Sequence, residues 1–149
     1  IPLDQELVPL PIGKAELLVE GDQVAILALG TMVYPSLEAA SILRDAGISP
    51  LVVNMRFVKP IDEELILSSA ERFDTIVTVE ENVIAGGFGT AVLELLEQRG
   101  ITTTRVVRIG YPDQYIEQGE QHELREQYRL TARGIASRIQ ELFEAPETP

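Results

Sequence analysis

The sequence predicts an α/β fold of three layers, α/β/α, in which helices cover both faces of a five-stranded, mostly parallel sheet with one antiparallel strand. Two observations lead to this prediction. Short apolar runs typical of buried strands alternate along the chain with segments whose apolar residues recur at helical spacing. Glycine and proline residues lie at many of the junctions, as expected for turns between strands and helices.

The first two predicted strands are the apolar runs at 15–19 and 23–29. Only the segment "EGD", at 20–22, separates them, and so short a separation is typical of a β-hairpin. We therefore expect these two strands to pair with each other in antiparallel fashion, which would supply the one antiparallel strand of the sheet.

The first helix is predicted to begin near Val33 and to end at Gly47. Pro35 fits the first turn, where its missing N–H leaves no hydrogen bond unmade. Gly47 suits the left-handed conformation that ends many helices. One face of this helix is predicted to face the core, through Val33, Leu37, Ala40 and Leu43.

Three more strands are predicted at 50–54, 75–79 and 103–109. The acidic residues 62–64 follow a loop closed by Pro60, and they predict the start of a second helix because the helix dipole favours acids in its first turn. The buried residues predicted for this helix are Leu65, Ile66, Ser69, Ala70 and Phe73.

A third helix is predicted to bury Val92, Leu93 and Leu96 and to end at Gly100. The remainder of the chain is predicted to be mostly helical. Its final apolar stripe is predicted to consist of Ile135, Ile139, Leu142 and Phe143.

The chain is predicted to contain one domain, at 13–144. Residues 1–12 carry three prolines and no clear period, which is typical of an extended linker or arm. Residues 145–149 are expected to form a frayed tail. Because the chain begins with Ile1 rather than Met, it is expected to be a piece of a longer protein.

The net charge of −12 on 149 residues argues against nucleic acid and against an anionic membrane surface as partners. There is no cysteine, so disulfides and thiolate chemistry are excluded. The single histidine, His122, lies in the polar run "QGEQHELREQ", which is typical of a solvated surface. No Gly-x-Ser-x-Gly motif presents a serine to it.

The segment "TVEENVIAGGFGTAV" places two acids and three glycines where a strand is predicted to end and a helix to begin. Ligands of open α/β sheets bind at such ends. Glu80 and Glu81 are consecutive, so their side chains point to opposite faces of an extended chain. They are therefore not expected to converge on one bond as an acid–base pair would.

Three interpretations of Gly86, Gly87 and Gly89 stay open: a tight turn, an interface role and a ligand site. A dinucleotide-binding fingerprint fitted to Gly87 and Gly89 has Val92 at its third glycine position, and no lysine follows as in a Walker loop. Free N–H groups at a helix N-terminus can hold an anion, although the two nearby carboxylates oppose one. A tight strand-to-helix turn is favoured, ahead of an interface role and of a ligand site.

Arg56 and Lys59 follow the strand at 50–54 and are expected near the same edge of the sheet. If the strand ends are neighbours, these cations are expected to pair with the acids of the glycine segment and order the edge or meet a partner. Phosphate recognition by Arg56 is a weaker alternative. No residue is assigned to catalysis, cofactor or metal. The predicted interface or carboxyl-edge residues are Arg56, Lys59, Glu80, Glu81, Asn82, Gly86, Gly87 and Gly89.

Three stretches together, "VVNMRFVKPIDEELI", "TVEENVIAGGFGTAVLELL" and "IGYPDQYIEQGEQHELR", resemble the C-terminal domain of 1-deoxy-D-xylulose-5-phosphate synthases. The resemblance extends from about Pro11 to Phe143. "MRFVKP" before an acidic helix start is shared in looser form by transketolases and by the β subunits of 2-oxoacid dehydrogenases, whereas "PDQYIEQG" points to the synthases. That family usually has a glycine just before the last helical segment, but "EQYRL", Glu126 to Leu130, has none.

The resemblance implies the transketolase C-terminal fold, in a domain that helps to form a homodimer and supports the active site from outside. It implies a transferase that uses thiamine diphosphate and Mg²⁺, held by other domains, to condense pyruvate with glyceraldehyde 3-phosphate on the way to isoprenoid precursors. The expected location is the bacterial cytoplasm or the plastid stroma, and the chain alone is expected to be inactive. Two alternatives stay open: an effector-binding regulatory α/β module, and the C-terminal domain of a 2-oxoacid dehydrogenase β subunit.

Overall fold

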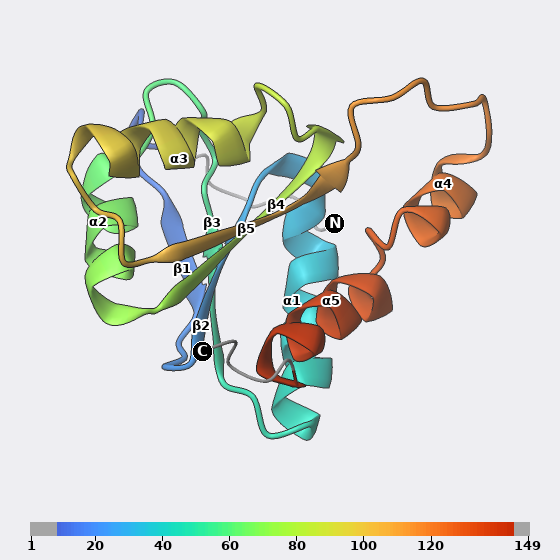
Figure 1. The fold of residues 1–149 in the computed structure, drawn as a ribbon, viewed down its shortest axis with the longest axis horizontal. Helices are drawn as coiled ribbons and strands as arrows, with labels where there is room; N and C mark the ends of the chain where they lie inside the picture. The colour runs from blue at the N-terminus through green and yellow to red at the C-terminus, as the bar shows by residue number, and fades with distance from the viewer. Residues whose placement is uncertain (1–8, 145–149) are drawn as a thin grey trace.

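The computed structural model describes residues 9–144, which form one sheet between two layers of helices (Figure 1). The elements, in chain order, are β1 (Glu16–Val19), β2 (Val24–Ala28), η1 (Gly30–Met32), α1 (Val33–Asp45), β3 (Pro50–Asn54), α2 (Glu63–Arg72), β4 (Thr75–Val83), α3 (Phe88–Gln98), β5 (Arg105–Tyr111), α4 (Gln121–Gln127) and α5 (Ala132–Glu144). Helices α1 and α5 cover one face of the sheet, and α2 and α3 cover the other. The predicted three-layer fold is therefore confirmed.

Most of the predicted arm and the whole predicted tail lie outside the described residues. The predicted domain bounds stay a prediction. Within residues 9–144, no helix combines the length and the apolar character needed to cross a bilayer.

The central strand of the sheet is β2. The strands lie in the order β1-β3-β2-β4-β5, and β2 has a parallel partner on each side. Its side chains alternate between the two layers: Val24 and Ile26 join the core cluster under α1 and α5, while Ala25 and Leu27 join the one under α2 and α3. All five residues of β2 are buried, as is typical of an inner parallel strand.

The predicted hairpin is wrong, because β1 pairs antiparallel with β3 and not with β2. The connection from β1 to β2 passes the start of β3, where the amides of Asp22 and Gln23 both donate to the Ser49 carbonyl, at 3.1 and 3.0 Å. Gly21 permits this crossing, since a Cβ atom there would lie 2.1 Å from the carbonyl carbon of Pro50. The glycine therefore serves a close approach of two backbones rather than a hairpin turn.

Two predicted strands have different bounds in the structure. β4 continues past the predicted end at Val79 to Val83, which lies opposite Tyr111 of β5 after an irregularity in register. β5 begins at Arg105, two residues later than predicted. As a result Glu80, which was expected in a loop, is a buried residue of β4.

The predicted helices are confirmed in place, with two errors in their apolar faces. α1 begins at Val33, and Gly47 follows it with φ of 83°. Leu93 and Phe143 were expected to be buried, but they are 37% and 46% exposed. In α3 the buried face passes through Leu95 and its helical neighbours on either side rather than through Leu93.

The junction between α4 and α5 is made without the expected glycine. Arg129 adopts φ of 58°, in the left-handed region. Its N–H donates to the Glu126 carbonyl at 3.1 Å, and the N–H of Leu130 donates to the Arg125 carbonyl at 2.7 Å. This pair of bonds is the Schellman motif, whose left-handed position is usually glycine. The Arg129 side chain, in turn, pairs with Glu141 of α5 at 2.5 Å.

Replacing Arg129 with glycine is expected to give a more stable protein than replacing it with alanine. Both changes remove the pair with Glu141, but only alanine keeps a Cβ atom in the left-handed conformation, which costs about 1 kcal/mol. The free energy of unfolding from urea titrations is the measurement, and Arg129→Gly should exceed Arg129→Ala by about that amount. Equal stability of the two variants would show that this backbone conformation carries no strain.

Candidate functional site

The glycine segment between β4 and α3 is a turn that is closed by a carboxylate of the chain itself. Glu80 is fully buried, and it accepts hydrogen bonds from the N–H of Phe88 at 2.6 Å and the N–H of Gly89 at 2.8 Å. These amides belong to the first turn of α3, where N–H groups have no partner within the helix. Negative charge also suits this end of the helix dipole. Glu80 therefore fills the position in which a helix N-terminus would hold an anion.

Two of the three glycines are required by close contacts, and the third by its conformation. A Cβ atom at Gly87 would lie 2.3 Å from Oε2 of Glu80, and one at Gly89 would lie 2.5 Å from Oγ1 of Thr78. Gly86 has φ of 71°, which other residues rarely adopt. The tight strand-to-helix turn favoured from the sequence is present, and the interface role of these residues stays a prediction.

Arg108 of β5, which sequence reasoning misses, holds the glycine turn from the neighbouring strand. Its Nη1 donates to the Ile84 carbonyl at 3.0 Å and to Oγ1 of Thr90 at 3.1 Å. Its aliphatic part covers Gly89, where a Cβ atom would lie 2.7 Å from Cγ of Arg108. No local pattern indicates this contact, because it exists only when β5 lies beside β4.

Glu81 points away from Glu80 and binds α4, so the predicted opposition of these two side chains is confirmed. It accepts two hydrogen bonds from Arg125, from Nε at 2.7 Å and from Nη2 at 2.5 Å. It also accepts from Nε2 of Gln121 at 3.1 Å and from the Thr31 hydroxyl at 2.5 Å. This cluster joins the turn after β2, the end of β4 and α4.

α4 depends on this cluster because it has no fully buried residue of its own. The edge-to-face contact of Tyr128 with Tyr111, with ring centroids 5.3 Å apart, adds an apolar attachment at its end. The polar run "QGEQHELREQ" is therefore only partly the solvated surface that was expected. His122 is exposed, whereas the Arg125 side chain is 22% exposed and paired.

The hydrogen bonds from Arg125 lower the pKa of Glu81, with further help from the Thr31 hydroxyl, and they outweigh burial, which acts in the opposite direction. Burial raises the pKa of the Tyr111 phenol, and the charge of Glu81 acts in the same direction. The Glu81 carboxylate is thus held in its ionised form with its oxygens occupied by donors, which is unsuited to a general base.

The expected pairing of Arg56 with the acids of the glycine segment does not form. Arg56 follows β3, which is separated from β4 by β2, and its guanidinium pairs instead with Glu16 of β1 at 2.7 Å. Lys59 is exposed further along the same loop, and Asn82 is exposed near the end of β4. The eight predicted residues therefore lie along the carboxyl edge of the sheet in two separate groups.

A groove of about 740 Å³ lies at this edge between the start of α1 and α4. It is lined by Gly30, Thr31, Tyr34, Pro35, Glu38, Gln121 and Arg125. The chain leaves β2 toward one face and β4 toward the other, and such a switch point is the usual ligand position in open α/β sheets. The lining cation, Arg125, is already paired with Glu81, and Glu38 adds negative charge, so the groove is poorly suited to a phosphate.

The arrangement is suited to holding segments together rather than to acid–base chemistry. The two adjacent carboxylates lie on opposite faces, and each is engaged by donors of the chain. Among residues 9–144, no three histidine, aspartate or glutamate side chains gather closely enough to hold a metal ion.

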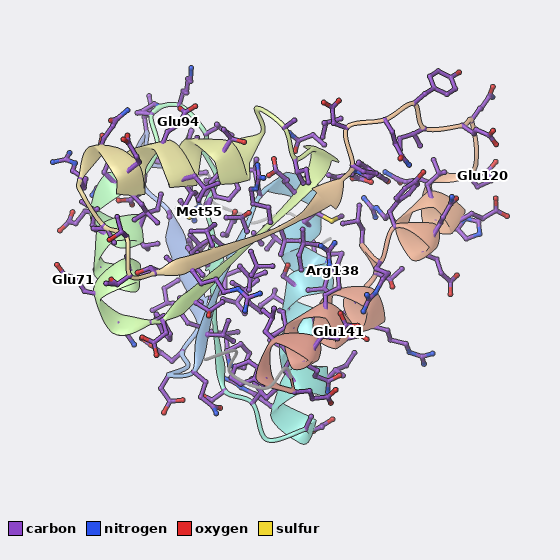
Figure 2. All side chains as sticks on the ribbon, viewed as in Figure 1. Met55, Glu71, Glu94, Glu120, Arg138 and Glu141 are labelled. Carbon is purple, nitrogen blue, oxygen red and sulfur yellow. The ribbon has the colours of Figure 1, made fainter. Side chains whose placement is uncertain are left out.

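Replacing Glu80 with glutamine is expected to destabilise the protein by about 2–3 kcal/mol, because the amide group places a donor against an N–H of α3 and removes a charge-assisted hydrogen bond. The matched control is Glu94→Gln on the outer side of the same helix, where the side chain is exposed (Figure 2). Chemical denaturation gives both free energies of unfolding. A loss at Glu80→Gln no larger than at Glu94→Gln would contradict the assigned role.

The attachment of α4 is expected to weaken in acid. The folded state lowers the pKa of Glu81 below its unfolded value of about 4.3, so the pair contributes its full stability above that value and loses it as the pH falls through the folded-state pKa. Hydrogen exchange should show protection of the α4 amides, corrected for intrinsic rates, falling below about pH 4.3.

The variant Glu81→Gln should reduce this protection about tenfold at neutral pH and remove its pH dependence. Glu38→Gln, which changes the carboxylate that lines the groove, serves as the control and should behave as the wild type. Retention of full α4 protection in Glu81→Gln would show that other contacts attach this helix.

The family model of the transketolase C-terminal domain matches residues 13–135. The chain is 59% identical over 139 residues to 1-deoxy-D-xylulose-5-phosphate synthase 1 of Geobacter metallireducens. The aligned residues cover 93% of this chain and 22% of that protein. The chain is 57% identical over 143 residues to synthase 2 of Geobacter sulfurreducens, with 95% and 23% covered. The chain thus spans less than a quarter of the length of these relatives.

Among solved structures, a chain described as "Split gene transketolase, inactive beta4 tetramer" has a TM-score of 0.79 and 39% identity, with 90% of this chain and 42% of that chain covered. A transketolase of Pichia stipitis has a TM-score of 0.63 at 22% identity, with 85% and 17% covered, and shows the likeness of fold. Both likenesses agree with the family match over residues 13–135. The chain therefore belongs to the transketolase C-terminal domain family.

Proposed function

We propose that this chain is the C-terminal, non-catalytic domain of a thiamine diphosphate-dependent transferase that condenses pyruvate with glyceraldehyde 3-phosphate to 1-deoxy-D-xylulose 5-phosphate. The observation that carries the proposal is 59% identity to a protein named as that synthase, of which the chain covers only 22%. The chemistry then belongs to the remaining part of the enzyme, and the chain supports it from outside. A bacterial cytoplasm is the location that fits these bacterial relatives.

The geometry of the carboxyl edge supports a non-catalytic role. In the described residues, the helix N-terminus best placed for a diphosphate is occupied by the Glu80 carboxylate, which would repel one. The guanidinium of Arg125 is engaged by Glu81, and no metal-binding cluster accompanies it within residues 9–144. The residues do not fit thiamine diphosphate with its Mg²⁺, so both cofactors are assigned to other domains.

The carboxyl edge is the surface that we assign to contacts with those domains or with a second subunit. Three large side chains on it are exposed to solvent in the described chain: Tyr34, Val83 and Tyr115, at 54%, 36% and 89%. Val83 follows the predicted edge residue Asn82 in β4, and Asn82 and Gly86 are also exposed. Large exposed side chains with apolar surface are a feature of interaction sites. The relative described as an inactive tetramer of β chains agrees with a part that is inactive alone.

A second candidate is an effector-binding module, and the groove between α1 and α4 favours it. Its position at the switch point of the sheet suits a small ligand. Its lining of Tyr34, Pro35 and Glu38 favours a cationic or neutral molecule with a flat apolar part over a phosphate. Thermal stabilisation by such molecules, lost in Tyr34→Ala, would support this candidate, and stabilisation by thiamine diphosphate would contradict both.

The proposed function is tested by exchanging domains. We expect a chimera, in which this chain replaces the matching segment of the Geobacter metallireducens synthase, to form product from pyruvate and glyceraldehyde 3-phosphate. The same synthase without the segment, and this chain alone, should form none. Calorimetry should detect no thiamine diphosphate binding to the chain alone. Product formation or tight cofactor binding by the isolated chain would overturn the proposal.

The chimera also separates the two parts of the proposal. A chimera that folds and dimerises but remains inactive would contradict the assignment to this synthase. A chimera with the double change Tyr34→Ala and Tyr115→Ala should lose activity together with dimerisation, whereas Leu93→Ala, an exposed position on α3, should keep both. Equal behaviour of the two variants would place the interface elsewhere.

A further inference from the structure

Within residues 9–144, no strand lies beside the outer edge of β5. The sheet ends at β5, which pairs only with β4. Arg105 and Tyr111 direct their main-chain groups toward β4, as shown by the hydrogen bonds of the Arg105 amide and the Tyr111 carbonyl. Because these directions alternate along a strand, Val106, Arg108 and Gly110 direct theirs away from the sheet. This edge is a template on which another strand can pair.

The sequence of this edge favours pairing. β5 reads "RVVRIGY", seven residues that are rich in β-branched and aromatic side chains and contain no proline. The opposite edge of the sheet is formed by β1, which has four residues and an irregular register between Leu17 and Val19. Short length and irregularity are devices that keep an edge from pairing, and β5 has neither over most of its length.

One side chain of α5 reaches across this edge. Nη2 of Arg138 donates to the outward carbonyl of Arg108 at 3.3 Å, and Figure 2 shows the labelled Arg138 between α5 and the sheet. The contact uses an acceptor that an incoming strand would need. It also places a positive charge at the strand edge, beside the main chain of Arg108.

Arg138 is held there at an electrostatic cost. Burial lowers its pKa, and the neighbouring Arg129 acts in the same direction. Glu141 acts in the opposite direction, but this carboxylate is already bound to Arg129. A side chain of similar length without charge, such as methionine, would cover the same surface of α5 without that cost. The cation is therefore best explained by what it does at the strand edge.

We propose that Arg138 blocks the β5 edge against antiparallel pairing with β5 of a second copy of this chain. Two copies that met at this edge would have to break the Arg138 contact with the Arg108 carbonyl. They would also bring the Arg138 side chains of the two copies together across one two-fold axis. Like charges at that distance disfavour the pairing, so the sheet ends at five strands.

The test compares variants of the full 149-residue chain by sedimentation velocity over a wide range of concentration. Arg138→Met removes the charge and the donor, and it should strengthen self-association by at least about tenfold. Arg133→Met, which makes the same change of net charge at an exposed position of the same helix, should match the wild type. Arg138→Lys, which keeps the charge, should also stay close to the wild type.

Hydrogen exchange locates the contact. In the wild type, the amides of Val106 and Arg108 should stay unprotected at every concentration, and in Arg138→Met they should become protected as association proceeds. Association of Arg138→Met without protection of these amides would overturn the proposal, as would equal association of Arg138→Met and Arg133→Met. Protection of the same amides in the wild type at high concentration would overturn it independently of whether any variant folds. Arg138→Gln provides the same comparison if Arg138→Met does not fold.

Discussion

The hydrogen bonds from the start of α3 to the buried carboxylate of Glu80 are the interaction on which the carboxyl edge of this domain depends. They extend β4 beyond the point where its apolar run ends, because Glu80 must lie under the helix to reach the two amides. They also dictate glycine at position 87, where any side chain would collide with the carboxylate. A motif that looks like an anion-binding loop is thereby closed by an anion of the chain itself.

Other charged side chains along this edge are also paired with partners from the chain itself. Glu81 is bound by Arg125 of α4, and Arg56 is bound by Glu16 of β1. The Glu81–Arg125 pair attaches α4 to the end of β4, whereas the Glu16–Arg56 pair joins β1 to the loop after β3. Acidic side chains outnumber basic ones in this chain, which gives the net charge of −12. These ion pairs therefore engage some of its few basic side chains in structural contacts.

Helix α4 and the turn that follows it differ from the rest of the fold in how they are held. The central strands are held by burial on both faces, whereas α4 has no fully buried residue and is attached by polar contacts and one aromatic pair. The turn into α5 uses Arg129 in a left-handed conformation that glycine adopts at less cost. An arginine at this position gains a contact with Glu141 in return, which ties the turn to the helix that follows.

The sequence by itself determined the layers, the order of the elements and the opposition of Glu80 and Glu81, because these follow from local periodicity and from the alternation of side chains along a strand. It also placed the start of α1 at Val33 and the glycine that ends it at Gly47, because both depend on neighbours within a few residues. Only the tertiary structure decided the partner of β1, since "EGD" permits either a hairpin or a crossing past Pro50. It alone decided the partners of Arg56, Arg108 and Arg125, because those contacts join separate strands and helices. Local sequence encodes conformation and burial, whereas the pairing of distant groups depends on which strands become neighbours.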